Sequence, residues 1–105
     1  MARKVRWTPR ASLLLDQIAL RIAEESPAAA GKLVTDLLDA AETLTTLFDR
    51  GRKVPELGDS EYRELLIREY RLIYRMRPDE VQVIGIVHGA RDFRSWWRRL
   101  RWRRV

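Results

Sequence analysis

The 105-residue sequence contains no cysteine and only one histidine. The lack of cysteine excludes disulfide bonds, thiol catalysis and cysteine-based metal centres, and one histidine cannot build a zinc site alone. We therefore expect neither a metal ion nor another cofactor. No apolar run approaches the ~20 residues that a helix needs to cross a bilayer. The first ten residues also lack the apolar core of a secretory signal, so we expect a cytoplasmic protein without a membrane partner.

Lysine is scarce beside arginine, with three lysines against eighteen arginines. The guanidinium group forks onto carboxylates and phosphates, so this bias suits anion recognition, although a GC-rich genome would produce the same bias. Residues 1–90 hold equal numbers of basic and acidic residues, whereas residues 91–105 hold seven arginines and one aspartate. The whole net charge of +6 therefore comes from the last fifteen residues, a segment expected to attract an anionic partner.

The length predicts a single domain, residues 1–105, with a modest hydrophobic core. Alternation in residues 4–7 predicts a short strand. Thr8-Pro9 and Ser26-Pro27 each combine a capping side chain with a proline at the first helical position, so each predicts a helix start. Both following segments carry one apolar stripe, and the second stripe runs on to Phe48. The short connection predicts an antiparallel helical hairpin, which Gly51 would end.

After the polar loop 51–62 the periodicity changes to alternation. Segments 63–69, 70–76 and 81–88 are predicted to be strands, with a turn at 77–80. The sequence therefore predicts an α+β fold, in which an antiparallel helical hairpin packs on a mainly antiparallel four-stranded sheet in the order β-α-α-β-β-β. A basic C-terminal helical segment, residues 91–105, would follow.

The alternation along each predicted strand indicates on which face of the sheet its charged side chains lie. In the middle strand Leu72, Tyr74 and Met76 share the face expected to pack on the helices, which leaves Arg71 and Arg75 together on the opposite face. In the last strand we place His88 on one face with the residues two and four positions before it, Ile86 and Ile84.

The C-terminal segment places four apolar residues on one helical stripe surrounded by arginines: Phe93, Trp96, Trp97 and Leu100. Such a stripe is typical of a helix that covers an edge of the core. Interleaved tryptophan and arginine also suit nucleic acid, an anionic membrane interface or an acidic partner protein. We interpret 93–100 as a partly docked helix and 101–105 as its freer end.

Three stretches together carry a resemblance to a known protein family: "GRKVPE" (51–56), "YRELLIREYRLIYRM" (62–76) and "VQVIGIVHGARD" (81–92). With the order of the elements, they resemble the RelE/ParE superfamily of toxins from bacterial type II toxin–antitoxin systems, over nearly the whole chain. The resemblance implies a growth-inhibiting toxin that is neutralised by a cognate antitoxin, which wraps it with an extended or helical segment. RelE-type members cleave mRNA on the ribosome, and ParE-type members poison DNA gyrase. The stretches look closer to the ParE type, which favours gyrase as the target; a non-toxic nucleic-acid-binding module is a further alternative.

The ribonuclease alternative implies particular residues. By the RelE pattern, Arg71 would contact the scissile phosphate and Arg91 would serve the leaving group. Other ribonuclease members of the superfamily use a glutamate base near the loop, which Glu56 could match, and His88 is a further candidate although it lies too early for their terminal histidine. The set is incomplete, because strand 63–69 lacks the lysines of RelE and no tyrosine follows the last strand. For a ParE-type member no catalytic set can be transferred.

Each of these residues also has a structural interpretation. Arg71 and Arg75 could pair with Glu64 and Glu69 across the strands. His88 could be a hydrogen-bonded structural residue, and Glu56 could simply be solvated in its loop. Contacts to the target or the antitoxin are assigned to seven side chains, Arg75 among them: Arg68, Arg75, Trp96, Trp97, Arg98, Arg101 and Trp102.

Overall fold

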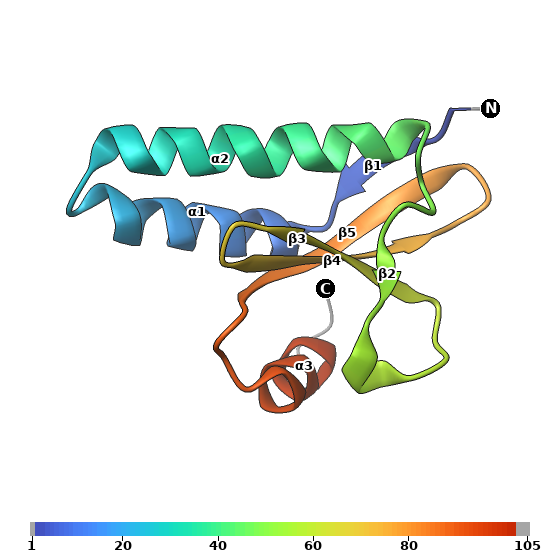
Figure 1. Ribbon diagram of the computed structural model, residues 1–105. Coiled ribbons are helices and arrows are strands. Elements are labelled where there is room, and N and C mark those ends of the chain that lie inside the picture. Colours follow the sequence, from blue (N-terminus) through green and yellow to red (C-terminus); the bar gives the residue numbers. More distant parts are fainter. Residues whose placement is uncertain (1, 103–105) are drawn as a thin grey trace.

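Helices cover both faces of a central sheet in the computed structural model, which describes residues 2–102, with only the backbone of residues 101 and 102. Two helices lie on one face and a third lies on the other (Figure 1). The predicted α+β class is confirmed, and the predicted elements follow one another in the expected order. In chain order the elements are β1 (Lys4–Trp7), α1 (Pro9–Ala23), α2 (Pro27–Glu42), the 3₁₀ turn η1 (Thr43–Thr45), β2 (Arg52–Lys53), the 3₁₀ turn η2 (Pro55–Leu57), β3 (Tyr62–Ile67), β4 (Tyr70–Met76), β5 (Glu80–His88) and α3 (Phe93–Trp102).

The sheet has five strands in the order β1-β5-β4-β3-β2. Only the β1–β5 pair is parallel among these neighbours, and the other three pairs are antiparallel. The prediction of four strands was wrong, because β2 lies inside the expected polar loop. Arg52 and Lys53 pair with Glu64 and Arg63 of β3, and a strand of two residues is too short to show alternation in the sequence.

Both predicted helix starts are confirmed. The Thr8 hydroxyl accepts a hydrogen bond from the amide of Ala11, and the Ser26 hydroxyl accepts one from Ala29, each at 3.1 Å. These bonds satisfy amide groups that the first turn of a helix leaves without an internal partner. Proline follows directly in both places and has no amide hydrogen to satisfy.

The end of the second helix differs from the prediction, since α2 stops at Glu42 and η1 follows. The Thr43 and Thr45 hydroxyls donate to the carbonyls three residues before them, and such bonds compete with continued α-helix. Gly51 therefore does not end a helix. It lies against β3 and β4, where an added Cβ would sit 2.7 Å from the Glu64 carbonyl oxygen, so only glycine fits.

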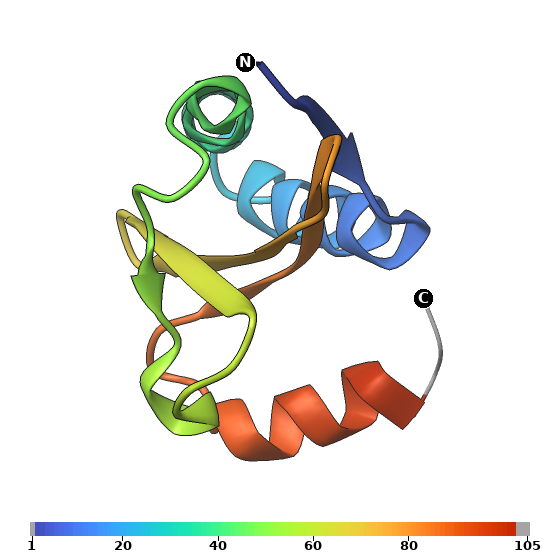
Figure 2. The ribbon, with the colours of Figure 1, turned by 90° about the vertical axis from the view of Figure 1, so that its right-hand side faces the viewer.

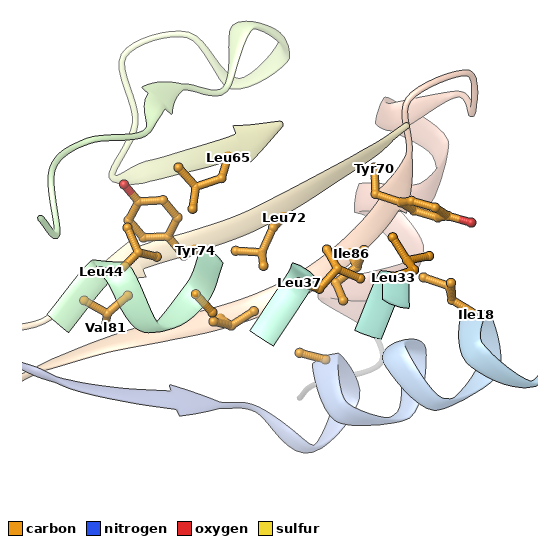
Figure 3. Packing of buried hydrophobic residues seen from close by; sticks show 13 residues of the cluster. Ile18, Leu33, Leu37, Leu44, Leu65, Tyr70, Leu72, Tyr74, Val81 and Ile86 are labelled. Carbon is orange, nitrogen blue, oxygen red and sulfur yellow. The ribbon is translucent and has the colours of Figure 1, made fainter. Parts of the chain in front are cut away.

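The first hydrophobic core lies between the α1–α2 hairpin and the sheet. Leu72 and Tyr74 of β4 point into it toward Leu37 and Leu44 (Figure 3). The predicted assignment of Leu72 and Tyr74 to the helix-packed face is thus confirmed, and Met76 packs at the edge of the same core. The Tyr74 hydroxyl stays satisfied in this apolar layer because it accepts a 2.9 Å hydrogen bond from the Gly51 amide.

A β-bulge changes the predicted face of Ile84. Ile73 pairs with Gly85, but Tyr74 pairs with Val83, so Ile84 is an extra residue in β5. One extra residue reverses the alternation beyond it. Ile86 consequently packs in the core beneath the α1–α2 hairpin, whereas Ile84 packs in a second cluster on the opposite face. The prediction that Ile84 shares a face with Ile86 and His88 was wrong.

The second core is built by α3, which lies across the other face of the sheet (Figure 2). The predicted docking of residues 93–100 is confirmed, because all four stripe residues are buried: Phe93, Trp96, Trp97 and Leu100. They pack on Val54, Ile73, Ile84 and Val87. An added Cβ at Gly85 would lie 2.9 Å from the Trp96 ring, so the absent side chain lets α3 approach closely. The expected freer end, 101–105, lies outside the described residues apart from the backbone of its first two.

Candidate functional site

Arg71 lies at the centre of a buried ion-pair network. Its Nε donates to Glu64 on β3 at 2.6 Å, and its Nη1 and Nη2 donate to the two carboxylate oxygens of Glu56 at 2.9 and 2.6 Å. Arg71 is 8% exposed and Glu64 only 1%. The pairing of Arg71 with Glu64, one of the structural interpretations, is confirmed. The bidentate partner Glu56 comes from η2, fifteen residues away in the chain.

Neighbouring elements complete the network. Arg52 of β2 donates to the second oxygen of Glu64 at 2.7 Å. The Arg71 guanidinium lies 4.4 Å from the centre of the Phe93 ring of α3, an arrangement that attracts a cation to the aromatic face. Arg94 of α3 donates to the backbone oxygen of Glu56. One cationic side chain thus joins β3, β4, η2 and α3.

The charges in this network oppose proton transfer by Glu56. Its hydrogen bonds with Arg71 hold the pKa of the Glu56 carboxyl below its ordinary value of 4.5, despite partial burial. The hydrogen bonds with Glu56 also raise the pKa of the Arg71 guanidinium above its ordinary value. A general base works best when its pKa lies near the operating pH, whereas Glu56 is a weakened base with both oxygens engaged. The arrangement therefore favours the structural interpretation of these two residues.

The lowered pKa of Glu56 predicts a pH-dependent contribution to stability. A carboxylate whose pKa is depressed by folding stabilises the protein above its unfolded pKa, and this stabilisation is lost as the pH falls through the folded value. Glu56→Gln is expected to lower the free energy of unfolding by about 1 kcal/mol at neutral pH, because the pair is partly exposed. Urea unfolding at a series of pH values should show the difference from the parent protein shrinking below about pH 4.5. A difference that stays constant into acid, or one matched by the exposed Glu25→Gln, would contradict the assignment.

His88 and Arg91 lie apart from this network. His88, on β5, faces the α1–α2 side beside Tyr70, with 5.3 Å between ring centres. Its Nδ1 accepts from the Ala90 amide at 3.0 Å, and its Nε2 lies 3.4 Å from a Glu69 oxygen. His88 and Arg91 line one cavity between α1 and the end of β5, whereas Arg71 and Glu56 line another beside Gly89. The four residues of the ribonuclease hypothesis are therefore divided between two cavities.

The residues predicted to contact a target occupy different surroundings. Arg68 adopts a positive φ of 54° in the β3–β4 turn and pairs with Asp36 of α2. Arg75 donates to Gln82 at 2.8 Å and lies 3.7 Å from Glu61; it does not pair with Glu69, which lies at the far end of the hairpin.

The C-terminal members of the predicted contact set differ in exposure. Trp96 and Trp97 are buried, while Arg98 is exposed on α3. The side chains of Arg101 and Trp102 lie outside the described residues. Arg10 and Arg21 on α1 were not among the residues predicted from the sequence, because only the apolar stripe of that helix entered the prediction. Their helical spacing could have indicated them, since Arg10 and Arg21 lie on the same side of α1 as Gln17, the side toward α3.

Residues 5–93 match the family model described as the ParE toxin of the type II toxin–antitoxin system parDE. The chain belongs to the ParE toxin family. The resemblance found in the sequence is thereby confirmed, and it is the ParE branch of the superfamily that matches. Comparison with curated protein sequences gave no match.

Solved structures share the ParE-family fold. The chromosomal ParDE toxin–antitoxin system from P. aeruginosa aligns with a TM-score of 0.70 at 22% identity, covering 83% of this chain and 96% of that one. The toxin–antitoxin complex RelBE2 from Mycobacterium tuberculosis aligns with a TM-score of 0.60 at 20% identity, covering 84% and 99%. At such identities the likeness shows the fold alone.

The described residues offer neither a metal site nor a membrane-spanning helix. No group of three or more histidine, aspartate or glutamate side chains in that part of the chain could hold a metal ion. None of the helices within residues 2–102 is long and apolar enough to cross a bilayer.

Proposed function

We propose that this ParE-family chain arrests growth by inhibiting DNA gyrase, and that a cognate antitoxin holds it inactive in the cytoplasm. The family match over residues 5–93 supports a toxin. The observation that favours gyrase inhibition over RNA cleavage is the buried Arg71, which is engaged by two carboxylates. Inhibition by binding requires no acid, base or phosphate clamp from the toxin.

RNA cleavage would require the Arg71 network to open. Attack by a 2′-hydroxyl needs a base, an acid for the leaving oxygen and cations at the scissile phosphate. To meet a phosphate, Arg71 would have to leave Glu64, whose buried carboxylate would keep only the half-exposed Arg52 as a partner, and breaking a buried ion pair is strongly destabilising. Glu56 would also have to give up the hydrogen bonds that lower its pKa. The ribonuclease hypothesis therefore carries an energetic cost that gyrase inhibition does not.

The antitoxin part of the proposal has two supports. Both structural relatives named above are toxin–antitoxin systems. The charge excess of residues 91–105 also suits an acidic partner segment. The exposed arginines of α3, Arg94, Arg98 and Arg99, would be available to such a segment.

The experiment measures two activities of the purified chain in parallel. Negative supercoiling by purified gyrase is expected to fall as the chain is added and to return when the antitoxin encoded beside it is supplied. Ribosome-bound mRNA is expected to stay intact. Unchanged supercoiling at high concentrations of the chain would refute gyrase inhibition. If mRNA were cleaved instead, and Arg91→Gln abolished the cleavage while keeping the fold, the ribonuclease hypothesis would replace it.

A further inference from the structure

A groove between α1 and α3 is lined by four arginines. Arg10 and Arg21 come from α1, Arg91 follows β5, and Arg99 lies on α3. Two adjoining cavities form the groove, because both are lined by Gln17, Arg91 and Trp96 among others. We call this surface the arginine groove. Two of its four arginines belong to the C-terminal segment that carries the net charge of the chain.

The arginines of the groove are gathered in one place without carboxylate partners among the described side chains. Several arginines on other surfaces form ion pairs, as Arg6 does with Glu80 and Arg77 with Glu61, and others, such as Arg63, donate to backbone oxygens. Among the side chains of residues 2–100, none of the four groove arginines lies within ion-pair distance of a carboxylate. Arg21 reaches the Tyr70 hydroxyl at 3.4 Å and Arg99 reaches the Ser95 hydroxyl at 3.2 Å.

Acidic residues are also missing from the lining of the groove in the described part of the chain. Asp92, the nearest acidic residue in sequence to Arg91, points its carboxylate at the Ser95 amide at the start of α3. Like charges gathered in a concave surface raise its potential and concentrate counter-ions there. The groove is therefore built to receive an anion that the described residues do not supply.

The hydrophobic residues beneath the groove favour phosphates over an acidic protein as that anion. Ile86, Trp96 and Leu100 are each more than nine-tenths buried in the two cores. Protein partners gain most of their affinity from apolar anchors that enter pockets, and these buried side chains offer them little surface. Arginine and glutamine side chains, in contrast, are the donors that contact the phosphate backbone of nucleic acids.

We infer that the arginine groove binds the phosphate backbone of duplex DNA. Arg10 and Arg21 are eleven residues apart on α1, which is about 16 Å along the helix. That length spans about five phosphates of one DNA strand. Binding through phosphates alone carries no base readout, so affinity is independent of sequence and falls steeply with salt. The choice of DNA rather than RNA rests on the proposed function, because gyrase acts on DNA.

The test measures binding of the full chain to a short fluorescent DNA duplex by anisotropy over a range of salt concentrations, without gyrase. Arg10→Gln/Arg99→Gln is expected to weaken binding about tenfold and to reduce the salt slope by about 2, one for each phosphate contact removed. The matched control, Arg6→Gln/Arg77→Gln, removes the same charge from ion-paired positions outside the groove and is expected to change affinity less than about twofold. Circular dichroism would verify that both variants are folded.

Several outcomes would overturn the inference. The inference fails if the parent chain does not bind the duplex. It also fails if the control variant loses as much affinity as the groove variant, because the loss would then come from the change in net charge and not from the groove. Tighter, groove-dependent binding of a matched RNA duplex would reassign the groove to RNA, and equal competition by polyglutamate would reassign it to an acidic protein. Since gyrase is absent from this assay, its result stands apart from the supercoiling measurement.

Discussion

Replacing Arg71 by alanine is expected to lower the free energy of unfolding by about 3–5 kcal/mol, the range for breaking a buried ion pair. The substitution leaves the Glu64 carboxylate buried with only Arg52, whose side chain is 56% exposed. It also removes the cation that lies over Phe93 and holds Glu56. The substitution therefore removes stabilising contacts of β4 with β3, η2 and α3 at once.

Urea unfolding followed by circular dichroism measures this effect, with Arg75→Ala as the control. Arg75 lies on the same strand, but its ion pair is partly exposed, so its removal should cost less than about 1 kcal/mol. Combining Arg71→Met with Glu64→Leu should recover much of the loss, because apolar groups of similar volume can replace a buried pair. A loss below that of Arg75→Ala would show that the network contributes little to folding.

This expectation changes how activity data on Arg71 should be interpreted. In an RNA-cleavage assay, loss of activity in Arg71→Ala would follow from unfolding as readily as from lost chemistry. Arg91 is exposed, and its side chain makes no hydrogen bond to the residues described. Arg91→Gln is consequently the better test of the ribonuclease hypothesis.

Trp96→Ala is expected to destabilise the protein by about 3–5 kcal/mol, as truncation of a large buried aromatic residue does. Trp96 is 4% exposed and packs beside Phe93 and Trp97. Its ring lies over Gly85, which has no side chain that could fill the space left by the truncation. The cavity would open between α3 and β5, so the docking of α3 should weaken first.

Denaturant unfolding, together with hydrogen exchange of α3 amides, checks this prediction. Leu20→Ala is the control, because Leu20 is 70% exposed on α1 and its truncation should change stability by no more than about 0.5 kcal/mol. If Trp96→Ala kept the parent stability yet lost inhibition of the target, Trp96 would be a contact residue rather than part of the core.

The sequence predicted features that depend on neighbouring residues. The helix starts at Thr8 and Ser26 are set by a capping hydroxyl and the proline beside it, and both appear in the structure. The faces of β4 follow from strict alternation, which places Leu72 in the first core and Ile73 in the second.

Features that depend on distant residues could not be predicted from the sequence. The bulge at Ile84 depends on the register with β4, and β2 exists only because β3 is beside it. For the candidate site, the sequence suggested the pairing of Arg71 with Glu64 across adjacent strands, but it could not show that η2 folds back to place Glu56 on the same guanidinium. The arginine groove likewise needs the fold, since Arg10 and Arg99 belong to elements at opposite ends of the chain.

The parallel pairing of β1 with β5 has a consequence for the order of events during synthesis. Lys4 pairs with Glu80, and Trp7 pairs with Val83, so β1 has no partner strand until residues 80–83 have been synthesised. The α1–α2 hairpin depends on local contacts and can form early, whereas pairings between distant segments form slowly. Until β5 has been made, the nascent chain thus exposes an unpaired β1 and the apolar face of the α1–α2 hairpin. Because β5 follows the other four strands in the chain, the sheet can close only after all of them have been synthesised.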